Sequence, residues 1–498
     1  MNNKIVKSMI SVTGIVLVAK AFGFVKQMVT ANAFGATIDT DIISISEGLI
    51  SNVDFLLIQA LSTAFIPIYI QIKKDSESKS RVFISNIIKL FLLITILISL
   101  VFVVASPLIS RILAPTYSPE LSGRLSLYIK ILSPVLILIV GMAVFNSLLK
   151  ANERFIPGEL IGFIQSVLLI ALVFIFGKTV GPDILVIGFI AYAVIDLVYL
   201  MICSKGMWII SKGNPFLDSN VIKMLRMMGP LLLGYSLVFV NQQIDKMIVS
   251  GLGDGTITAM NYAAVLSNFI TAFVASICSV SFTYVAKCIT DKNEAEAANL
   301  TKQSTIQLVT LLLPISILTV ANAYDIVMVV FGRGEFIGKA VLNCSYALIG
   351  YGLMFVPFVL RELFSKFLYS YGDSKTPMIN SAISIAINII LSIVLSRFVG
   401  VLGVTLATSF SVLVCAILNI VSSNKRNSYL MPREYLKPLP KWVIGGIVCL
   451  ATSIVGQLLL KDMNSYMRLI IIVGVSFVGY GILTYSILKP LIHKIVKK

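Results

Sequence analysis

Charged side chains interrupt the first long apolar stretches of this 498-residue sequence, in a pattern that could bind an ionic ligand. In the segment KAFGFVKQMVTANAFGATIDTD (20 to 41), Lys20, Lys26 and Gln27 precede Asp41. A charge inside a bilayer costs roughly 2.5 to 3.5 kcal/mol on insertion scales, so such residues commonly have a function. Ammonium groups bind phosphate, whereas carboxylates accept hydrogen bonds from sugar hydroxyls or bind a cation. The combination therefore favours an amphiphilic, phosphate-bearing ligand.

Helical geometry brings these residues onto narrow polar faces. At 100° per residue, Lys20, Lys26 and Gln27 share a wedge of ~120° on one helix. On the next helix, Asp41 lies on a stripe of 3- and 4-residue steps, with Glu47 and Asp54 beside it. Further polar candidates lie in apolar stretches of the second half: Asn241, Gln242, Asp245, Lys246, Arg361 and Lys366. We expect all twelve residues to line a substrate-binding cavity.

Two structural alternatives apply to any single member of this set. Opposite charges, such as Lys20 or Lys26 with Asp41, Glu47 or Asp54, can pair simply to satisfy one another within a helix bundle. Lys20, Asp41 and Lys366 could also lie near a membrane interface, where long side chains reach water at little cost. The placement of opposite charges in both halves is what favours a binding cavity.

The elements that position these residues must be membrane-spanning helices. The sequence is 57% hydrophobic and 13% charged, with a mean hydropathy of +0.96, which is typical of a polytopic membrane protein. Apolar stretches of about 20 residues are long enough to cross the bilayer. Fourteen are found, near 9–31, 41–70, 83–107, 127–149, 158–177, 184–203, 224–250, 256–286, 305–331, 340–370, 378–396, 400–421, 442–460 and 467–488. An all-α polytopic membrane protein is therefore predicted.

The net charge of +17 is explained by topology. With both termini in the cytoplasm, most of the 40 Lys and Arg residues fall in inside loops and termini, as the positive-inside rule requires. The basic segments include 424–441 and the tail 493–498. We therefore predict no nucleic-acid partner. The single histidine, His493, lies in this tail, which excludes histidine-based metal sites and catalytic triads.

Three sequence anchors recur after 217 to 220 residues, which indicates an internal repeat. The matching segments are 28–38 with 247–257, 62–77 with 280–294, and 149–157 with 369–377. Six spans per repeat would make both repeats enter the membrane from the same side, as in alternating-access transporters. We predict two six-helix bundles related by a pseudo-two-fold axis, in residues 1–215 and 216–430, with an appended helix pair and basic tail in 431–498.

Nothing in the sequence predicts catalysis or a bound cofactor. Neither GxxxxGK[ST] nor GxGxxG occurs between a strand and a helix, and the loops are short. A membrane glycosyltransferase or acyltransferase would need catalytic groups on a sizeable loop. We therefore expect a transporter without cofactors, driven by Na⁺, H⁺, the membrane potential or the substrate's own gradient.

Several stretches resemble the MurJ-like branch of the multidrug/oligosaccharidyl-lipid/polysaccharide exporter superfamily. They span nearly the whole chain: 20–41, AFIPIYIQ (64–71), VNQQIDKMIVSGLGDGTITAMNYA (240–263), FGRGEF (331–336), KFLYSYGDSKTP (366–377) and GVLGVTLATS (400–409). The resemblance implies a fourteen-helix, two-lobed flippase in the bacterial cytoplasmic membrane. Its substrates would be undecaprenyl-pyrophosphate-linked sugars, lipid II in the type members, moved to the outer leaflet for peptidoglycan synthesis. Membrane lipids and envelope-synthesis proteins would be its partners.

The sequence departs from the family pattern at several cationic positions. Lys20 and Lys26 stand where the family has arginines, and Asp41 stands at its helix 2 aspartate. The family's LPNLLRRxFAEGAF segment reads GLISNVDFLLIQAL here, so that Val53 and Asp54 replace an arginine pair. Because lysine cannot form a bidentate fork on pyrophosphate, three alternatives remain: a flippase for O-antigen, capsule or teichoic-type saccharides, a cation-coupled multidrug exporter, and a non-transporting scaffold for envelope synthesis.

Overall fold

The computed structural model of this protein describes residues 3–430, 435 and 437–496, and all regular structure in those residues is helical. Side chains are not described for 3–13, 231, 233–235, 237 and 488–496. His493, much of the basic tail and part of the basic segment 424–441 therefore lie outside the described side chains. Each of the fourteen predicted spans overlaps a helix or a pair of consecutive helices, so the all-helical membrane class is confirmed.

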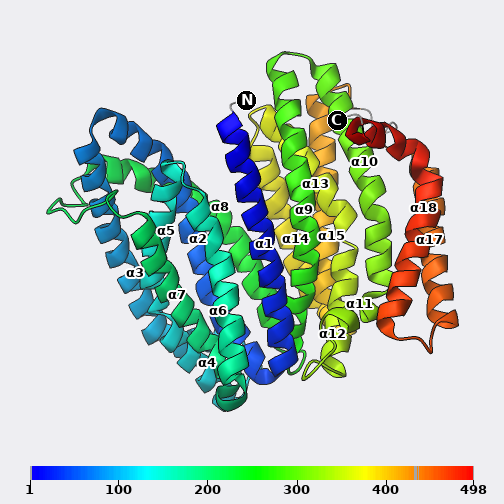
Figure 1. The fold of residues 1–498 in the computed structure, drawn as a ribbon, viewed down its shortest axis with the longest axis horizontal. Coiled ribbons are helices and arrows are strands. Elements are labelled where there is room, and N and C mark those ends of the chain that lie inside the picture. Colours follow the sequence, from blue (N-terminus) through cyan, green and yellow to red (C-terminus); the bar gives the residue numbers. More distant parts are fainter. Residues whose placement is uncertain (1–2, 431–434, 436, 497–498) are drawn as a thin grey trace. The chain divides into compact units, whose positions relative to one another are not determined.

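The chain forms two compact units, of which the first comprises Met1–Thr258 together with Gly334–Phe336. Its buried apolar core lies mainly between α2, α3, α5 and α8. In Figure 1 the helices of this unit run from blue to green. They are α1 (Asn3–Phe34), α2 (Ile38–Asp75), α3 (Glu77–Leu113), α4 (Pro119–Leu132), α5 (Val135–Ala151), α6 (Ile156–Val180), the short 3-10 helix η1 (Gly181–Asp183), α7 (Ile184–Cys203) and α8 (Ser219–Val249).

The second unit comprises Ala259–Arg333 and Ile337–Lys498. Its main apolar core joins α9, α10 and α13, and α15 packs against α12, α13 and α14. The helices are α9 (Thr256–Thr290), whose first residues belong to the first unit, α10 (Glu294–Ala321), α11 (Ala323–Val330), α12 (Lys339–Gly352), α13 (Phe355–Ser370), α14 (Lys375–Val399), α15 (Val401–Arg426), α17 (Leu439–Leu459) and α18 (Ser465–Val496).

Two of the predicted spans are bent pairs of helices. α4 and α5 meet at 42° and α12 and α13 at 41°. Pro134 lies at the first break and Pro357 in the first turn after the second. Proline lacks an N–H and its ring displaces the carbonyl four residues earlier, which bends a helix. In the described residues, ten helices are long and apolar enough to cross a membrane, or up to twelve if each bent pair is one span.

The helix pattern repeats along the chain as the sequence anchors indicate. α4 and α12 each have 14 residues and begin at Pro119 and Lys339. α6 and α14 each have 25 residues and begin at Ile156 and Lys375. The bent pair thus recurs at nearly the same spacing as the sequence anchors.

The predicted lobe boundaries at residues 215 and 430 stay a prediction. α8 packs against α2 and α3 and belongs to the first compact unit, whose boundary falls at Thr258. The helix pair α17 and α18, predicted as an appendage, lies side by side (Figure 1) and packs against α10 within the second unit.

A buried ion pair attaches α18 to α11. Arg468 donates from Nε to Asp325 Oδ2 at 3.0 Å and from a terminal nitrogen to Oδ1, so the pair is bidentate. The side chains of Arg468 and Asp325 are only 16% and 4% exposed. A bidentate guanidinium–carboxylate contact holds both groups in a fixed geometry. This pair fixes the C-terminal helices onto the second unit.

We expect Arg468→Ala to destabilise the protein, because it leaves the Asp325 carboxylate buried without its cation. Breaking a buried pair in this way costs about 3 kcal/mol or more. The measurement is the free energy of unfolding in detergent, with Arg397→Ala, an exposed arginine at the end of α14, as the matched control. The double variant Arg468→Ala/Asp325→Ala should lose less than the sum of the single changes; strict additivity would contradict the pairing.

Candidate functional site

Two lysines and a glutamate from three helices of the first unit converge around the first third of α2. Lys246 of α8 donates from Nζ to the Ser44 carbonyl oxygen at 3.3 Å. Glu47, on the next turn, lies within electrostatic range of both Lys246 and Lys26 of α1. We call Lys26, Glu47 and Lys246 the lysine cluster. Its formal charge is +1, which leaves capacity to bind an anion.

A glycine makes room for this cluster on α2. A methyl group added at Gly48 would lie 2.0 Å from Lys246 Nζ, closer than any real contact. The ammonium group therefore packs directly against the α2 backbone. All three cluster side chains are half-buried, so their charges are partly shielded from solvent. Charge interactions are stronger in such a setting than in bulk water.

Asp41 has a well-defined structural contact. Its Oδ1 accepts a hydrogen bond from the Thr258 backbone N–H at 2.7 Å, and its side chain is 1% exposed. Thr258 is the third residue of α9, so the carboxylate caps the start of that helix, where backbone N–H groups lack intrahelical partners. Thr258 Oγ1 also donates to Thr40 Oγ1 at 3.1 Å. A contact between Asp41 and substrate stays a prediction.

Glycine-dependent loops hold this end of the first unit together. Gly334 has φ +56°, and a Cβ there would lie 2.2 Å from the Asn32 carbonyl oxygen. Gly255 has φ +77°, with its Cβ position 2.0 Å from the Ala36 carbonyl oxygen. Both positions require glycine because of conformation and close approach. The segments ANAFGAT, GLGDGT and GEF, which contributed to the family resemblance, are thus in direct contact.

The remaining predicted residues of the first unit lie on the same three helices as the lysine cluster. Lys20 is exposed and Gln27 half-buried on α1. Asp54, on α2, has one carboxylate oxygen that is buried without a hydrogen-bond partner among the described residues. On α8, Asn241 and Asp245 are half-buried and Gln242 is exposed. Together with Asp41 and the cluster, these residues place ten of the twelve predicted positions in the first unit.

Arg361 and Lys366 lie on α13 of the second unit. Arg361 pairs with Glu362 at 2.9 Å and its guanidinium lies 4.7 Å from the centre of the Phe358 ring. Lys366 donates to Ser279 Oγ at 2.6 Å and to the Ala275 carbonyl oxygen at 3.3 Å, both on α9. Each cation thus already has a partner within its own unit.

Two polar residues that the sequence analysis did not select lie deep in the first unit. Asp196 of α7 is fully buried and accepts a hydrogen bond from Gln165 Nε2 of α6 at 2.7 Å. The signal was present in the sequence, since Asp196 is the only ionisable acid or base between Ile184 and Cys203 apart from tyrosine and cysteine. It was overlooked because no second charge lies near it in sequence.

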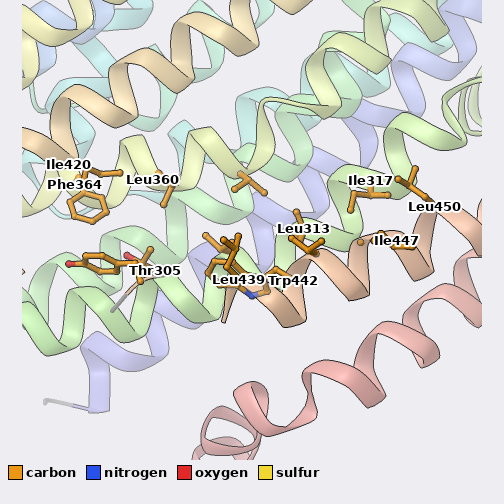
Figure 2. Close-up of a pocket in the computed structure, with 15 residues that line it drawn as sticks. Thr305, Leu313, Ile317, Leu360, Phe364, Ile420, Leu439, Trp442, Ile447 and Leu450 are labelled. Carbon is orange, nitrogen blue, oxygen red and sulfur yellow. The ribbon is translucent and has the colours of Figure 1, made fainter. Parts of the chain in front are cut away.

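An apolar cavity of about 580 Å³ lies within the second unit. Figure 2 shows its lining side chains, which come from α10, α13, α15 and α17 with Tyr435. Those labelled in the figure are Thr305, Leu313, Ile317, Leu360, Phe364, Ile420, Leu439, Trp442, Ile447 and Leu450. The size and apolar lining suit a hydrocarbon chain. Sequence patterns did not predict this cavity, because it depends on how four helices pack.

Metal ligation has no candidate in the part of the chain that the structure describes: no three His, Cys, Asp or Glu side chains are grouped to hold an ion.

The helix-capping contact of Asp41 gives a specific prediction. Asp41→Ala should lower the free energy of unfolding by about 1 kcal/mol, because the Thr258 N–H loses its acceptor. Asp41→Asn keeps an acceptor oxygen and should retain most of that stability. Thermal unfolding in detergent measures both, with exposed Asp75→Ala as control. Equal stability of Asp41→Ala and wild type would contradict the capping role.

Comparisons with known proteins address the family. The family model described as "Lipid II flippase MurJ" matches residues 30–473. Relatives named "Probable lipid II flippase MurJ" include one from Vibrio cholerae serotype O1, 24% identical over 475 residues, covering 92% of this chain and 89% of the relative. Another, from Rickettsia prowazekii, is 25% identical over 403 residues and covers 79% of each chain.

Solved structures show the same fold. A lipid II flippase MurJ in an inward closed conformation matches with a TM-score of 0.83 and 20% identity, covering 97% of this chain and all of the other. An inward-facing multidrug resistance MATE family transporter of the MOP superfamily matches with a TM-score of 0.67 and 12% identity, covering 83% of this chain and 98% of the other. The predicted family resemblance is confirmed, and this chain belongs to the lipid II flippase MurJ family.

Proposed function

We propose that this protein translocates lipid II from the inner to the outer leaflet of the bacterial cytoplasmic membrane, for peptidoglycan synthesis. The observation that carries the proposal is the lysine cluster, a half-buried group of net positive charge in a multi-pass membrane protein of the MurJ family. The alternative saccharide substrates and multidrug export are not favoured, because the matching family model is that of lipid II flippases.

The fold supports an alternating-access mechanism. In this proposal the chain crosses the membrane fourteen times, with both termini in the cytoplasm and the six-helix bundles related by a pseudo-two-fold axis. The recurrence of α4 and α6 as α12 and α14 supports the repeat. Rocking of such repeats relative to each other exposes a site to one side of the membrane at a time. The helices α17 and α18 are an addition to this repeat.

The lysine cluster would bind the pyrophosphate of the substrate. Lys26 and Lys246 would donate to phosphate oxygens, while Glu47 would keep the two ammonium groups apart when no substrate is bound. Charge-assisted hydrogen bonds of this kind are about twice as strong as neutral ones. Further contacts from the predicted residues of the first unit would orient the sugar: Lys20, Gln27, Asp54, Asn241, Gln242 and Asp245.

The apolar cavity of the second unit would hold part of the polyprenyl chain. A lipid-linked saccharide has an isoprenoid tail that gains free energy from burial against apolar side chains, at roughly 25 cal/mol per Å². Leu313, Leu360 and Leu450 present such a surface (Figure 2). The coupling energy in this proposal comes from Na⁺, H⁺ or the membrane potential, without a bound cofactor, and membrane lipids and envelope-synthesis proteins are its partners.

We expect Lys26→Ala and Lys246→Ala each to reduce translocation about tenfold or more, since each removes a charge-assisted hydrogen bond worth about 1.5 to 3 kcal/mol. The test is complementation of bacteria depleted of their lipid II flippase, read out as lipid II on the outer face of the membrane. Lys74→Ala, an exposed lysine at the end of α2, is the matched control.

Normal translocation by both cluster variants at wild-type membrane levels would remove the phosphate-binding role. Failure of the wild-type chain itself to complement, despite expression, would reject lipid II as substrate.

Narrowing the apolar cavity should also impair translocation. Leu313→Trp adds volume at the cavity wall between α10 and α17, which should hinder entry of a hydrocarbon chain while the fold is retained. Transport of lipid II should fall more than transport of an analogue with a short tail. Ile470→Trp, on an exposed part of α18, controls for the added aromatic ring. An equal effect on both substrates would argue against tail binding.

A further inference from the structure

Asp196 is a buried acid that the proposed substrate contacts do not use. Its side chain is 0% exposed. Oδ2 accepts the hydrogen bond from Gln165 Nε2 at 2.7 Å, whereas Oδ1 is buried without a hydrogen-bond partner in the described residues. The acid lies on α7, in the stretch Ile156–Cys203 that is long and apolar enough to cross a membrane. The unpartnered oxygen is therefore able to bind a ligand.

Asp196 shares a neighbour, Tyr192, with two acids of α2. Tyr192, one turn earlier on α7, is within electrostatic range of Asp196 and of Glu47 and Asp54 on α2. Glu47 in turn interacts with the lysines of the cluster. On α6 the neighbour of Asp196 is the uncharged Gln165, and in the described part of the chain no salt bridge joins Asp196 to a cation. Tyr192 is thus within range of acids on both α2 and α7, and one of them, Glu47, belongs to the lysine cluster.

An ionised carboxylate in such a place is unfavourable. Moving a charge out of water without a counter-ion costs several kcal/mol, whereas the neutral acid pays far less. A hard metal cation would need about six oxygen ligands, and Asp196 offers one unpartnered oxygen. A proton needs only that one atom. The ligand that fits Oδ1 is therefore a proton.

We propose that Asp196 is a proton-binding site of this protein, loaded at Oδ1 and held in position by Gln165. On loading, a proton from water forms the O–H bond and the carboxyl becomes neutral. On release, the proton returns to water and the carboxylate keeps the electron pair. Asp54, whose Oδ1 is also buried and unpartnered, lies within electrostatic range of the same Tyr192. Coupling of proton binding to transport rests on the proposed function. Proton binding at Asp196 does not depend on it.

Infrared titration of the full-length chain in lipid vesicles tests the site directly. The wild type should show a carbonyl-stretch band of a protonated carboxylic acid that Asp196→Asn lacks and that Asp462→Asn, a variant of an exposed acid in the α17–α18 turn, retains. Gln165→Leu should shift this band, because it removes the hydrogen bond to Oδ2. Identical acid bands in wild type and Asp196→Asn would overturn the proposal, as would loss of the band on adding Na⁺ at constant pH.

Transport in vesicles tests the consequence. An imposed pH gradient should change the rate of lipid II translocation by wild type and by Asp462→Asn, and Asp196→Asn should lose this dependence. If the rate of lipid II translocation by the wild type did not change with the pH gradient, proton coupling would be rejected. If the wild type moved no lipid II at all, the proposed function would fail, whereas the infrared band would still establish or refute the proton site.

Discussion

Several charged groups in this protein lie where another group compensates the cost of removing them from water, and the packing of their helices depends on that constraint. Lys246 packs on Gly48 and faces Glu47, which also faces Lys26. Asp41 accepts the N–H of Thr258. Arg468 and Asp325 form a bidentate pair. Since an uncompensated charge away from water costs several kcal/mol, each of these contacts restricts which helices can be neighbours.

The same constraint separates structural charges from candidates for function. The Arg468–Asp325 pair is structural, because each group has a partner of opposite charge and both side chains are largely buried. The lysine cluster has an excess cation, and Asp196 has an unpartnered oxygen. A group that lacks a counter-charge or a hydrogen-bond partner can bind a ligand that supplies it. An anionic headgroup and a proton are the two ligands that would complete them.

Backbone geometry contributes a second constraint at the loops. Gly255 and Gly334 adopt positive φ and approach the carbonyl oxygens of Ala36 and Asn32. These contacts join glycine-rich motifs that are far apart in the sequence. All of these motifs contribute to the family resemblance. Prolines bend two of the spans. Pro134 lies at the break between α4 and α5, where the angle is 42°, and Pro357 lies just after the break between α12 and α13, where the angle is 41°. The sequence analysis placed both spans but did not predict their bends.

The sequence by itself determined the helical membrane class and the approximate positions of the predicted spans, because apolar length and the 3.6-residue period are local properties of the chain. Its motifs also indicated the family, which the family model confirms. It also identified Lys26, Glu47 and Lys246 as candidates. Only the tertiary structure decided that these three meet, that Asp41 caps α9, and that Asp196 is buried beside Gln165. Such contacts depend on which helix faces pack together, and local periodicity does not specify the partner of a face.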